Sequence, residues 1–266
     1  MSGPRGWALV TGASSGIGRE LARLAGAEGY NLVLSGRDVT ALADLAREIE
    51  TASGVSARPC PADLSQPGAA AALWTRACEA ADGPIHVLVN NAGLGRHGAF
   101  ASDAGGDARE DEVIAVNVSA ATELMRLAIR TMRKRGAGRI LNVASAAGYM
   151  PGPGMAVYHA SKAYLLHLSE AVSEELSDTS ITVTALCPGV TRTGFFERAE
   201  MGTTWLMRIA PVPDAARVAR AGWRACMAGR RVAVTGIDNK IFTFLARIFP
   251  RRLVVKITGL MLRRTG

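Results

Sequence analysis

A tyrosine and a lysine four residues apart are the first candidates for chemistry in this chain. Tyr158 and Lys162 lie where the sequence predicts the start of a helix, so their side chains share one helical face. A nearby cation favours phenolate over phenol, and we therefore expect Lys162 to lower the pKa of Tyr158 from about 10 toward neutrality. A phenol tuned in this way can exchange a proton with a substrate oxygen. The same spacing also occurs on ordinary solvated helices, so the pair needs support from the rest of the chain.

A glycine-rich turn near the N-terminus predicts a nucleotide site. It follows the apolar run Ala8–Val10 and precedes helical periodicity. Glycines allow the tight turn and let the backbone approach a pyrophosphate, whose charge is favoured at a helix N-terminus. A glycine-rich connection without a ligand is the alternative, but the place of the turn in a first βα unit favours nucleotide binding. The predicted contacts are Gly12, Ser14, Ser15, Gly16, Ile17 and Gly18.

The end of the second predicted strand bears on the choice of cofactor. It reads Ser35-Gly36-Arg37, where a chain that binds NAD would carry an acidic residue. Arg37 can form a bidentate pair with a 2′-phosphate, which indicates NADP, with NAD as the alternative. The alternative is that Arg37 is a solvated residue at the start of the next helix and makes no contact with a cofactor. A second basic residue in the glycine-rich turn would strengthen the NADP interpretation, and serines stand there instead.

Short apolar runs alternate with helical periodicity along the chain. Near-continuous apolar runs are typical of strands that are buried on both faces. The predicted strands are Ala8–Val10, Leu32–Leu34, Val55–Pro59, Val87–Val89, Ile140–Val143, Ile181–Leu186 and Val232–Val234. This alternation predicts an α/β fold: one Rossmann-type, doubly wound parallel sheet with helices on both faces and a C-terminal helical extension. The predicted boundaries are residues 1–236 for the sheet domain and 237–266 for a basic amphipathic extension.

The net charge of +8 is concentrated at one end of the chain. Residues 240–266 hold seven Lys and Arg residues and no acid, which leaves about +1 for the rest. A nearly neutral body disfavours nucleic-acid binding. The four cysteines are scattered, without metal-ligand spacing, and we expect reduced, buried thiols and no metal site. The first strand begins without a basic segment or cleavage site before it, so we expect a cytoplasmic protein, with membrane association through the tail as an open alternative.

Several motifs occur together in a recognisable order. With Tyr158-x-x-x-Lys162, the glycine-rich turn, Asn90-Asn91-Ala92-Gly93 and Ser145, the sequence resembles the short-chain dehydrogenase/reductase family over about residues 6–236. The resemblance implies an NADP(H)-preferring oxidoreductase that transfers a hydride between nicotinamide and a carbonyl or secondary alcohol. An NAD-dependent alcohol dehydrogenase and a non-catalytic nucleotide-binding scaffold are the alternatives. The family also implies a homo-oligomer, a dimer or a tetramer.

The resemblance assigns a role to each site residue. Tyr158 would donate the proton, Ser145 would bind the substrate oxygen, and Lys162 would tune Tyr158 and hold the nicotinamide ribose. Asn117 would position a water for proton resupply. The remaining cofactor contacts would be Asp63 and Leu64 at the adenine, Asn90, Ala92 and Gly93 beside the cofactor, and Pro188, Gly189 and Thr193 at the nicotinamide end. Each residue also has a structural interpretation, such as a turn serine or a surface lysine.

Two further segments bear on the substrate. The Gly- and Pro-rich stretch after Ser145 predicts a loop in which Tyr149, Met150 and Met155 are candidate apolar contacts. The stretch after Thr193 is apolar and Met-rich, which indicates either a lid over a hydrophobic substrate or an ordinary amphipathic helix. Its residues are Phe195, Phe196, Met201, Trp205, Leu206 and Met207.

The C-terminal extension carries two apolar runs separated by Pro250. The first places Ile241, Phe242, Leu245, Ile248 and Phe249 on one helical face, and the second holds Leu253, Val254, Ile257, Leu260 and Met261. Neither run approaches the ~20 apolar residues that span a bilayer. Three interpretations remain open: a helix packed on its own body or on a partner subunit, a membrane-surface anchor, and a disordered tail.

Overall fold

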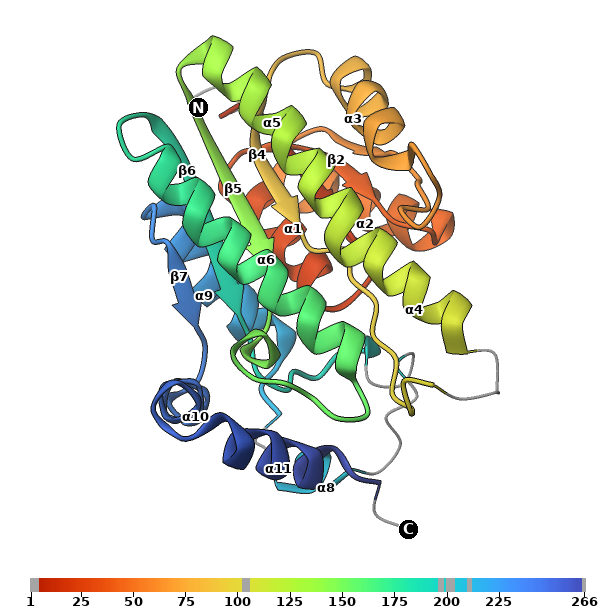
Figure 1. Cartoon of the computed structure of the whole chain (residues 1–266). Helices are drawn as coiled ribbons and strands as arrows, with labels where there is room; N and C mark the ends of the chain where they lie inside the picture. The colour runs from red at the N-terminus through yellow and green to blue at the C-terminus, as the bar shows by residue number, and fades with distance from the viewer. Residues whose placement is uncertain (1–4, 102–105, 196–198, 200–203, 210–211, 265–266) are drawn as a thin grey trace.

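Seven parallel strands form the centre of the computed structural model, which describes residues 5–101, 106–195, 199, 204–209 and 212–264 (Figure 1). The strands lie in the order β3-β2-β1-β4-β5-β6-β7, and every strand pair is parallel. Their bounds are β1 Trp7–Thr11, β2 Asn31–Ser35, β3 Ala57–Pro59, β4 Ile85–Asn90, β5 Ala137–Val143, β6 Ser180–Cys187 and β7 Val232–Val234. The order reverses between β1 and β4, so the connection after β1 opens at a topological switch point.

Helices cover both faces of the sheet, as the sequence predicted. One layer holds α1 (Gly16–Ala27), α2 (Val39–Ser53) and α9 (Ala215–Met227). The other holds α3 (Ala69–Ala80), α5 (Ala121–Arg135) and α6 (Ala156–Glu175). In Figure 1, α5 and α6 cross in front of the sheet while α1 and α9 lie behind it. The predicted doubly wound fold is therefore confirmed.

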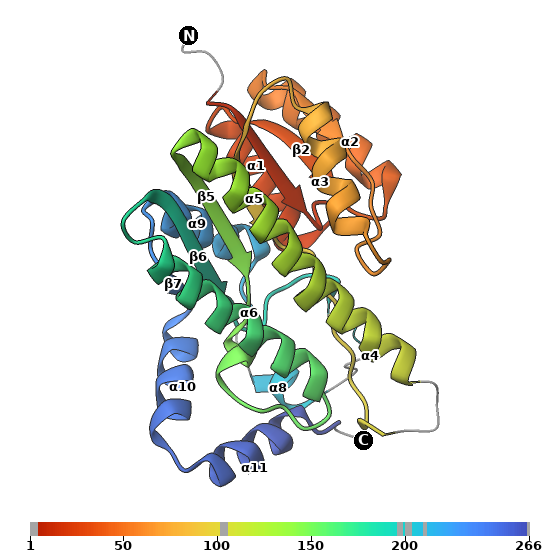
Figure 2. The same cartoon turned by 45° about the horizontal axis from the view of Figure 1, so that its top comes forward.

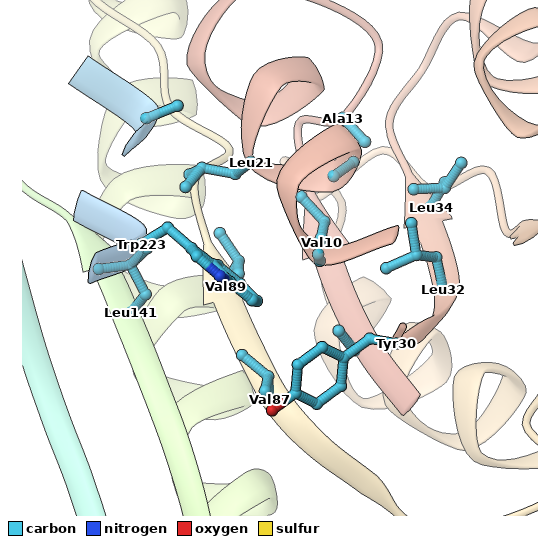
Figure 3. Close-up of a cluster of buried hydrophobic side chains, with 14 of the residues drawn as sticks. Val10, Ala13, Leu21, Tyr30, Leu32, Leu34, Val87, Val89, Leu141 and Trp223 are labelled. Atoms are coloured by element: carbon cyan, nitrogen blue, oxygen red, sulfur yellow. The ribbon is translucent and has the colours of Figure 1, made fainter. Parts of the chain in front are cut away.

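The apolar runs of the sequence are strands with both faces buried. All five residues of β1 and of β2 are buried. Figure 3 shows one side of this core, where Val10, Leu32 and Val89 from three strands face Trp223 and Leu21 from the helices. The ring of Tyr30 meets Trp223 edge-on at 5.8 Å between centroids. Burial on both faces explains why the strands read as continuous rather than alternating hydrophobic runs.

A π-helical turn interrupts the long helix that precedes β5. It spans Ala115–Ala120 and lies between α4 (Gly106–Ile114) and α5. Such turns add one residue to the helix and change which side chain faces inward, and they are frequent at functional sites. Here the turn holds Asn117, which is almost fully buried.

The segments that follow β5 and β6 combine loops with short helical turns. The loop after Ser145 contains a 3₁₀ turn, Ala146–Tyr149. A short helix, α8 (Trp205–Ile209), comes later in the chain than β6, which ends at Cys187. Of the predicted lid residues, Phe196 and Met201 lie outside the described residues.

The C-terminal extension forms two helices, α10 (Ile237–Ile248) and α11 (Arg251–Leu262), on either side of Pro250. Figures 1 and 2 both place them at the end of the molecule opposite the N-terminus. The interpretation as a disordered tail is therefore wrong. Over the part of the chain that the structure describes, no helix combines the length and hydropathy needed to cross a bilayer.

All four cysteines are free thiols. Cys60, Cys187 and Cys226 are buried as expected, but Cys78 is exposed on α3, which corrects the expectation that all four are buried. Among the described residues, no three His, Cys, Asp or Glu side chains gather closely enough to hold a metal ion.

Candidate functional site

The glycine-rich turn connects β1 to α1 and leaves the first turn of α1 available to a ligand. Gly12 and Gly16 have φ values of +64° and +56°, a region that side-chain-bearing residues rarely adopt. Ser15 is the N-cap residue of α1, yet its side chain makes no capping hydrogen bond. The backbone N–H groups at this helix end can therefore bind a phosphate, whose negative charge the helix dipole favours.

Thr11 and Asn91 hold this turn against the next strand of the sheet. The Asn91 Nδ2 donates to the backbone oxygens of Thr11 and Gly12 at 2.9 and 3.1 Å. The Thr11 hydroxyl accepts from the backbone N–H groups of Asn91 and Ala92, both at 3.0 Å. Gly18 fits beneath the turn because a Cβ there would lie 2.3 Å from both the Gly12 oxygen and the Asn91 amide. Gly18 was predicted to contact the cofactor, but it packs beneath the turn and does not line the cavity.

Arg37 and Asp63 follow β2 and β3, respectively. They line the far end of a cavity that begins at the glycine-rich turn. Arg37 is exposed, and its charge contributes to lowering the pKa of Asp63. The larger cause of that shift is Ser65, which donates its hydroxyl and its backbone N–H to the carboxylate at 2.8 and 3.1 Å. Asp38, beside Arg37, caps α2 by accepting from the Ala41 N–H at 2.9 Å. Arg37 is thus the cation placed to meet an anionic group here.

Tyr158 and Ser145 face each other where the cavity ends at the first turn of α6. Burial raises the pKa of Tyr158 to about 12, and a hydrogen bond with the Ser145 side chain acts in the opposite direction. Ser145 follows β5, and its hydroxyl accepts from the Ala147 N–H at 3.1 Å and donates to the Pro188 oxygen at 3.4 Å. The 3₁₀ turn after β5 and the proline after β6 therefore fix the position of this hydroxyl.

Lys162 lies one turn along α6 from Tyr158 and is buried. Its Nζ donates to the Val143 oxygen at 2.8 Å and stands 5.8 Å from the centre of the Tyr158 ring. Burial lowers the pKa of Lys162 to about 8. The expectation that Lys162 lowers the pKa of Tyr158 does not hold in this structure. Loss of hydration around the phenol outweighs other effects, and the ammonium group is directed to a backbone carbonyl.

Asn117 is fixed mainly by hydrogen bonds to the backbone of Leu94, in the segment after β4. Its Oδ1 accepts from the Leu94 N–H at 2.8 Å, and its Nδ2 donates to the Leu94 oxygen and the Ser161 hydroxyl, both at 2.9 Å. A Cβ on Gly93 would lie 3.2 Å from the Lys162 Nζ and 3.4 Å from the Asn117 Oδ1. The absence of a side chain at Gly93 therefore leaves room for both of these side chains.

One continuous cavity of about 570 Å³ connects the glycine-rich turn to Tyr158. Most predicted residues line it, and they are Gly12, Ser14, Ser15, Gly16, Ile17, Arg37, Asp63, Leu64, Ala92, Gly93, Ser145, Tyr158, Lys162, Pro188, Gly189 and Thr193. Gly18, Asn90 and Asn117 lie behind its wall. Asn90 instead links strands and helix, donating to the oxygens of Asn142 and Ala121 at 3.0 and 3.1 Å. The glycine backbone, the open helix end and Arg37 fit a dinucleotide with a phosphate on its ribose.

Residues that the sequence did not single out also line this cavity, among them Gly36, Asn91, Leu94, Val116 and Thr191. Asn91 lies inside a motif that was recognised, but its role depends on a hydrogen bond across the sheet that no local pattern reveals. Gly36, Leu94 and Thr191 contribute small or apolar surface on the connections after β2, β4 and β6, and Val116 does so from the π-helical turn. The first three have one signal in the sequence, their position a few residues after a predicted strand.

Apolar side chains from three segments surround the exposed side of Tyr158. Met155, Ala199 and Leu262 are buried together, and Tyr158, Phe195 and Leu206 pack against them. The ring of Phe195 lies 5.2 Å from that of Tyr158. Tyr149 and Met150, the other predicted wall residues, line a separate cavity beside α10 instead. Met155 and Phe195 therefore lie at the substrate side, together with a residue of α11 that the sequence did not suggest.

Comparisons with known proteins agree with this geometry. A family model described as short chain dehydrogenase matches residues 6–202. Ketoacyl reductase HetN of Nostoc sp. is 37% identical over 187 residues, which span 70% of this chain and 64% of that protein's own length.

Solved structures resemble the chain over almost its whole length. A short-chain dehydrogenase from Sphingobium yanoikuyae in complex with NADPH has a TM-score of 0.80 at 31% identity, covering 91% of this chain and 93% of that one. A bulky-bulky ketone specific alcohol dehydrogenase from Comamonas testosteroni has a TM-score of 0.75 at 30% identity, covering 91% and 92%. The chain therefore belongs to the short-chain dehydrogenase/reductase family of NAD(P)-dependent oxidoreductases.

Proposed function

We propose that this protein is an NADP(H)-preferring oxidoreductase that reduces the carbonyl group of a hydrophobic ketone, or oxidises the matching secondary alcohol. One observation carries the proposal: Ser145, Tyr158 and Lys162 lie in the same cavity as the uncapped start of α1. A proton donor and a nucleotide site thus share one continuous space. A scaffold that only binds a nucleotide has no chemical need for these three groups together.

The reaction needs two events at the carbonyl group. Bound NADPH supplies the hydride that the carbonyl carbon receives. Negative charge then develops on the substrate oxygen, and hydrogen-bond donors aimed at it stabilise the transition state. The Ala147 N–H fixes the position of the Ser145 oxygen, and the hydroxyl proton, which reaches the Pro188 oxygen at 3.4 Å in this structure, turns to the substrate oxygen instead. Tyr158 acts as the general acid and donates its proton to the same oxygen.

The raised pKa of Tyr158 fits the acid role. A phenol with a pKa of about 12 keeps its proton at neutral pH and is available as a donor in the reductive direction. Lys162 would hold the nicotinamide ribose through its buried ammonium group. Asn117, beside Lys162 across Gly93, positions a water that returns the proton from solvent.

Arg37 supports the preference for NADP(H). The guanidinium group is exposed at the cavity end beyond β2, where a 2′-phosphate on the adenosine ribose would lie. A solved relative that is 31% identical was obtained with NADPH. NAD is the alternative cofactor, because Asp63 lies nearby and carboxylates favour an unmodified ribose.

The substrate side favours an apolar ketone. Met155, Phe195, Leu206 and Leu262 present apolar side chains around Tyr158. A bulky-bulky ketone specific enzyme is among the similar structures at 30% identity. We therefore expect large ketones with apolar groups on both sides of the carbonyl to be better substrates than small ones.

The test is NADPH oxidation against a panel of ketones that increase in size, with NADH in parallel. We expect turnover to rise with apolar size and to be faster with NADPH. Tyr158→Phe should lower kcat by about 10²–10⁴ while NADPH binding is retained, because only the proton donor is removed. Tyr164→Phe on the same helix, away from the cavity, is the matched control. Unchanged turnover in Tyr158→Phe would disprove the mechanism.

We also infer a homo-oligomer, a dimer or a tetramer, from the family resemblance. Static light scattering on the full chain tests it, and a monomeric mass would contradict it. A cytoplasmic location likewise stays a prediction, which cell fractionation tests.

A further inference from the structure

The two C-terminal helices expose an unusual amount of apolar surface. Nine of the fourteen large apolar side chains that are exposed in the described residues belong to α10, α11 and their junction. They are Ile237, Ile241, Phe244, Leu245, Ile248, Phe249, Leu253, Ile257 and Leu260. Single exposed apolar residues are ordinary on protein surfaces, but a contiguous set marks an interaction site. We refer to these nine residues as the apolar stripe.

The apolar stripe has helical periodicity. On α10 its members occur at spacings of 4, 7, 8 and 11 residues from Ile237, so they share one face about 100° wide. Phe249 continues the stripe across the corner at Pro250. On α11 the members follow at Leu253, Ile257 and Leu260.

A different face of each helix attaches it to the body of the protein. Val254, Thr258 and Leu262 are the buried residues of α11, and Thr243 is that of α10. Arg247 lies over the Tyr149 ring at 5.0 Å, and His97 donates from Nε2 to the Leu262 oxygen at 2.8 Å. The helices are therefore already docked through their inner faces. The apolar stripe is not surface left over from a loose tail.

Basic residues run beside the apolar stripe. Lys240 on α10, Arg252 and Lys256 on α11, and Arg263 directly after α11 are all exposed. Their helical positions lie next to the apolar members and on the same flank of each helix. Asp238 is the one acidic residue among the described residues from 237 to 264. The surface is therefore apolar at its centre and cationic along its edge.

The position of these charges indicates whether a second copy of the chain or a lipid surface covers the apolar stripe. A two-fold contact between copies brings the same patch of each subunit together, and would gather the basic residues of both copies at one interface. Interface cores are also depleted in Lys. A surface of anionic lipids, by contrast, pairs its headgroups with the basic row and accepts the apolar side chains below them.

We propose that α10 and α11 attach the protein to the surface of an anionic lipid bilayer, with the apolar stripe inserted at the level of the headgroups. Each helix has 12 residues and so is about 18 Å long, too short to span the hydrocarbon core. Both helices lie in the plane of the interface and anchor the protein without crossing the bilayer. The attachment is electrostatic in part and therefore reversible by salt.

Vesicle flotation with the full-length protein tests the proposal. The probes are vesicles of phosphatidylcholine alone and of phosphatidylcholine with 30% phosphatidylglycerol, an amount chosen on the order of that in anionic membranes. We expect binding to the anionic vesicles, little binding to the neutral ones, and a marked loss of binding in high salt.

Two sets of variants separate the apolar from the cationic contribution. Ile241→Gln/Phe244→Gln/Ile257→Gln removes apolar contacts from exposed positions, and Val39→Gln on α2 is its control because Val39 is equally exposed elsewhere. Arg252→Gln/Lys256→Gln removes two cations and should lower the partition coefficient roughly 25-fold, at about fivefold for each. Arg133→Gln/Lys134→Gln at the end of α5 removes the same charge from another surface.

The outcomes are distinguishable. Equal flotation of the apolar variant and the full-length protein, or no binding to either vesicle, would overturn the proposal. So would a lower mass of the apolar variant by light scattering without any vesicle binding, which would show that a second copy covers the stripe. Circular dichroism melting of each variant checks that the substitutions leave the fold intact. None of these results depends on the oxidoreductase activity.

Discussion

At the scale of single residues, the buried ammonium group of Lys162 gives the site a pH dependence. Burial lowers its pKa to about 8, so Lys162 is a cation at pH 7 and loses its charge as the pH rises through about 8. Donation to the cofactor ribose weakens when that charge is lost. We therefore expect the Kd for NADPH to be constant below about pH 7 and to rise above pH 8.

Fluorescence titration of NADPH between about pH 6.5 and 9 measures this effect. Lys162→Met should bind NADPH roughly 10- to 100-fold more weakly and without the alkaline change, since a hydrogen bond from a charged donor is removed. An alkaline rise that persists in Lys162→Met would assign the titration to another group.

The sequence predicted the placement of the site residues better than their electrostatics. Ser145, Tyr158 and Lys162 share one cavity, as the motifs indicated. The pKa of Tyr158 moved in the direction opposite to the expectation, because side-chain spacing along a helix does not reveal burial or competing partners. Lys162 turned out to donate to the Val143 oxygen, which is a tertiary contact. The apolar contact from Leu262 is separated from Tyr158 by about a hundred residues and could not be read locally.

At the scale of elements, the π-helical turn and the chain at Leu94 depend on each other. The Asn117 side chain binds both backbone groups of Leu94, and the turn places it there. Asn117→Ala leaves those two groups without a partner, which should cost about 1–3 kcal/mol in free energy of unfolding. That loss corresponds to a fall in Tm on the order of 5 °C.

Calorimetry of Asn117→Ala beside Ser161→Ala measures the contribution of this contact. Ser161→Ala removes the third partner of Asn117 and keeps both bonds to Leu94, so its Tm should fall less. Equal Tm values for the two variants would show that the Leu94 contact contributes nothing to stability.

Hydrophobic pattern predicted the regular elements well. The strands from Ala8 to Leu186 were placed within a few residues, because runs buried on both faces have a clear signature. Val55–Pro59 was predicted as a strand, but only Ala57–Pro59 pairs, since this edge strand has one neighbour. The π-helical turn gave no signal, because one added residue in a helix hardly changes its periodicity. The helices of the extension were predicted, but their attachment through His97 was not.

A hydrogen bond from His97 connects the end of α11 to the body of the protein. His97 Nε2 donates to the Leu262 oxygen at 2.8 Å, and Leu262 packs beside Met155 at the substrate side. His97→Ala should loosen the end of α11 and raise the KM for bulky ketones roughly 2- to 10-fold, in line with one neutral hydrogen bond. Small ketones, which do not reach Leu262, should be affected less.

Steady-state kinetics with one large and one small ketone, together with hydrogen exchange over residues 251–262, measures that effect. His167→Ala is the control, because the His167 side chain is 76% exposed on α6. Equal changes of KM for both ketones would point to a general disturbance rather than to the wall near Leu262.

At the scale of the whole molecule, the sheet domain forms the cofactor cavity, and the extension contributes one residue beside Tyr158. The cavity is lined from Gly12 to Phe195 by residues that follow the strands of the sheet. The extension lies beyond residue 202, where the family match ends, and adds Leu262 to the substrate side. Its inner face therefore packs beside Tyr158, and its outer face carries the apolar stripe. Most of the cavity lies within the residues that the family model matches, and the extension lies outside them.

Because the cofactor cavity joins the ends of most strands, NADPH binding should stabilise the entire fold. A ligand at 100 times its Kd adds about 2.7 kcal/mol to the free energy of unfolding, which corresponds to a rise in Tm of about 5–11 °C for a domain of this size. With both cofactors at one fixed concentration, NADPH should give the larger rise, since Arg37 pairs with the 2′-phosphate. Arg37→Asp should reverse the order, because the carboxylate repels that phosphate and accepts hydrogen bonds from an unmodified ribose. Differential scanning fluorimetry of both proteins measures the four shifts. Equal shifts with NADPH and NADH in the unaltered protein would remove Arg37 from cofactor selection and leave the glycine-rich turn to bind both nucleotides alike.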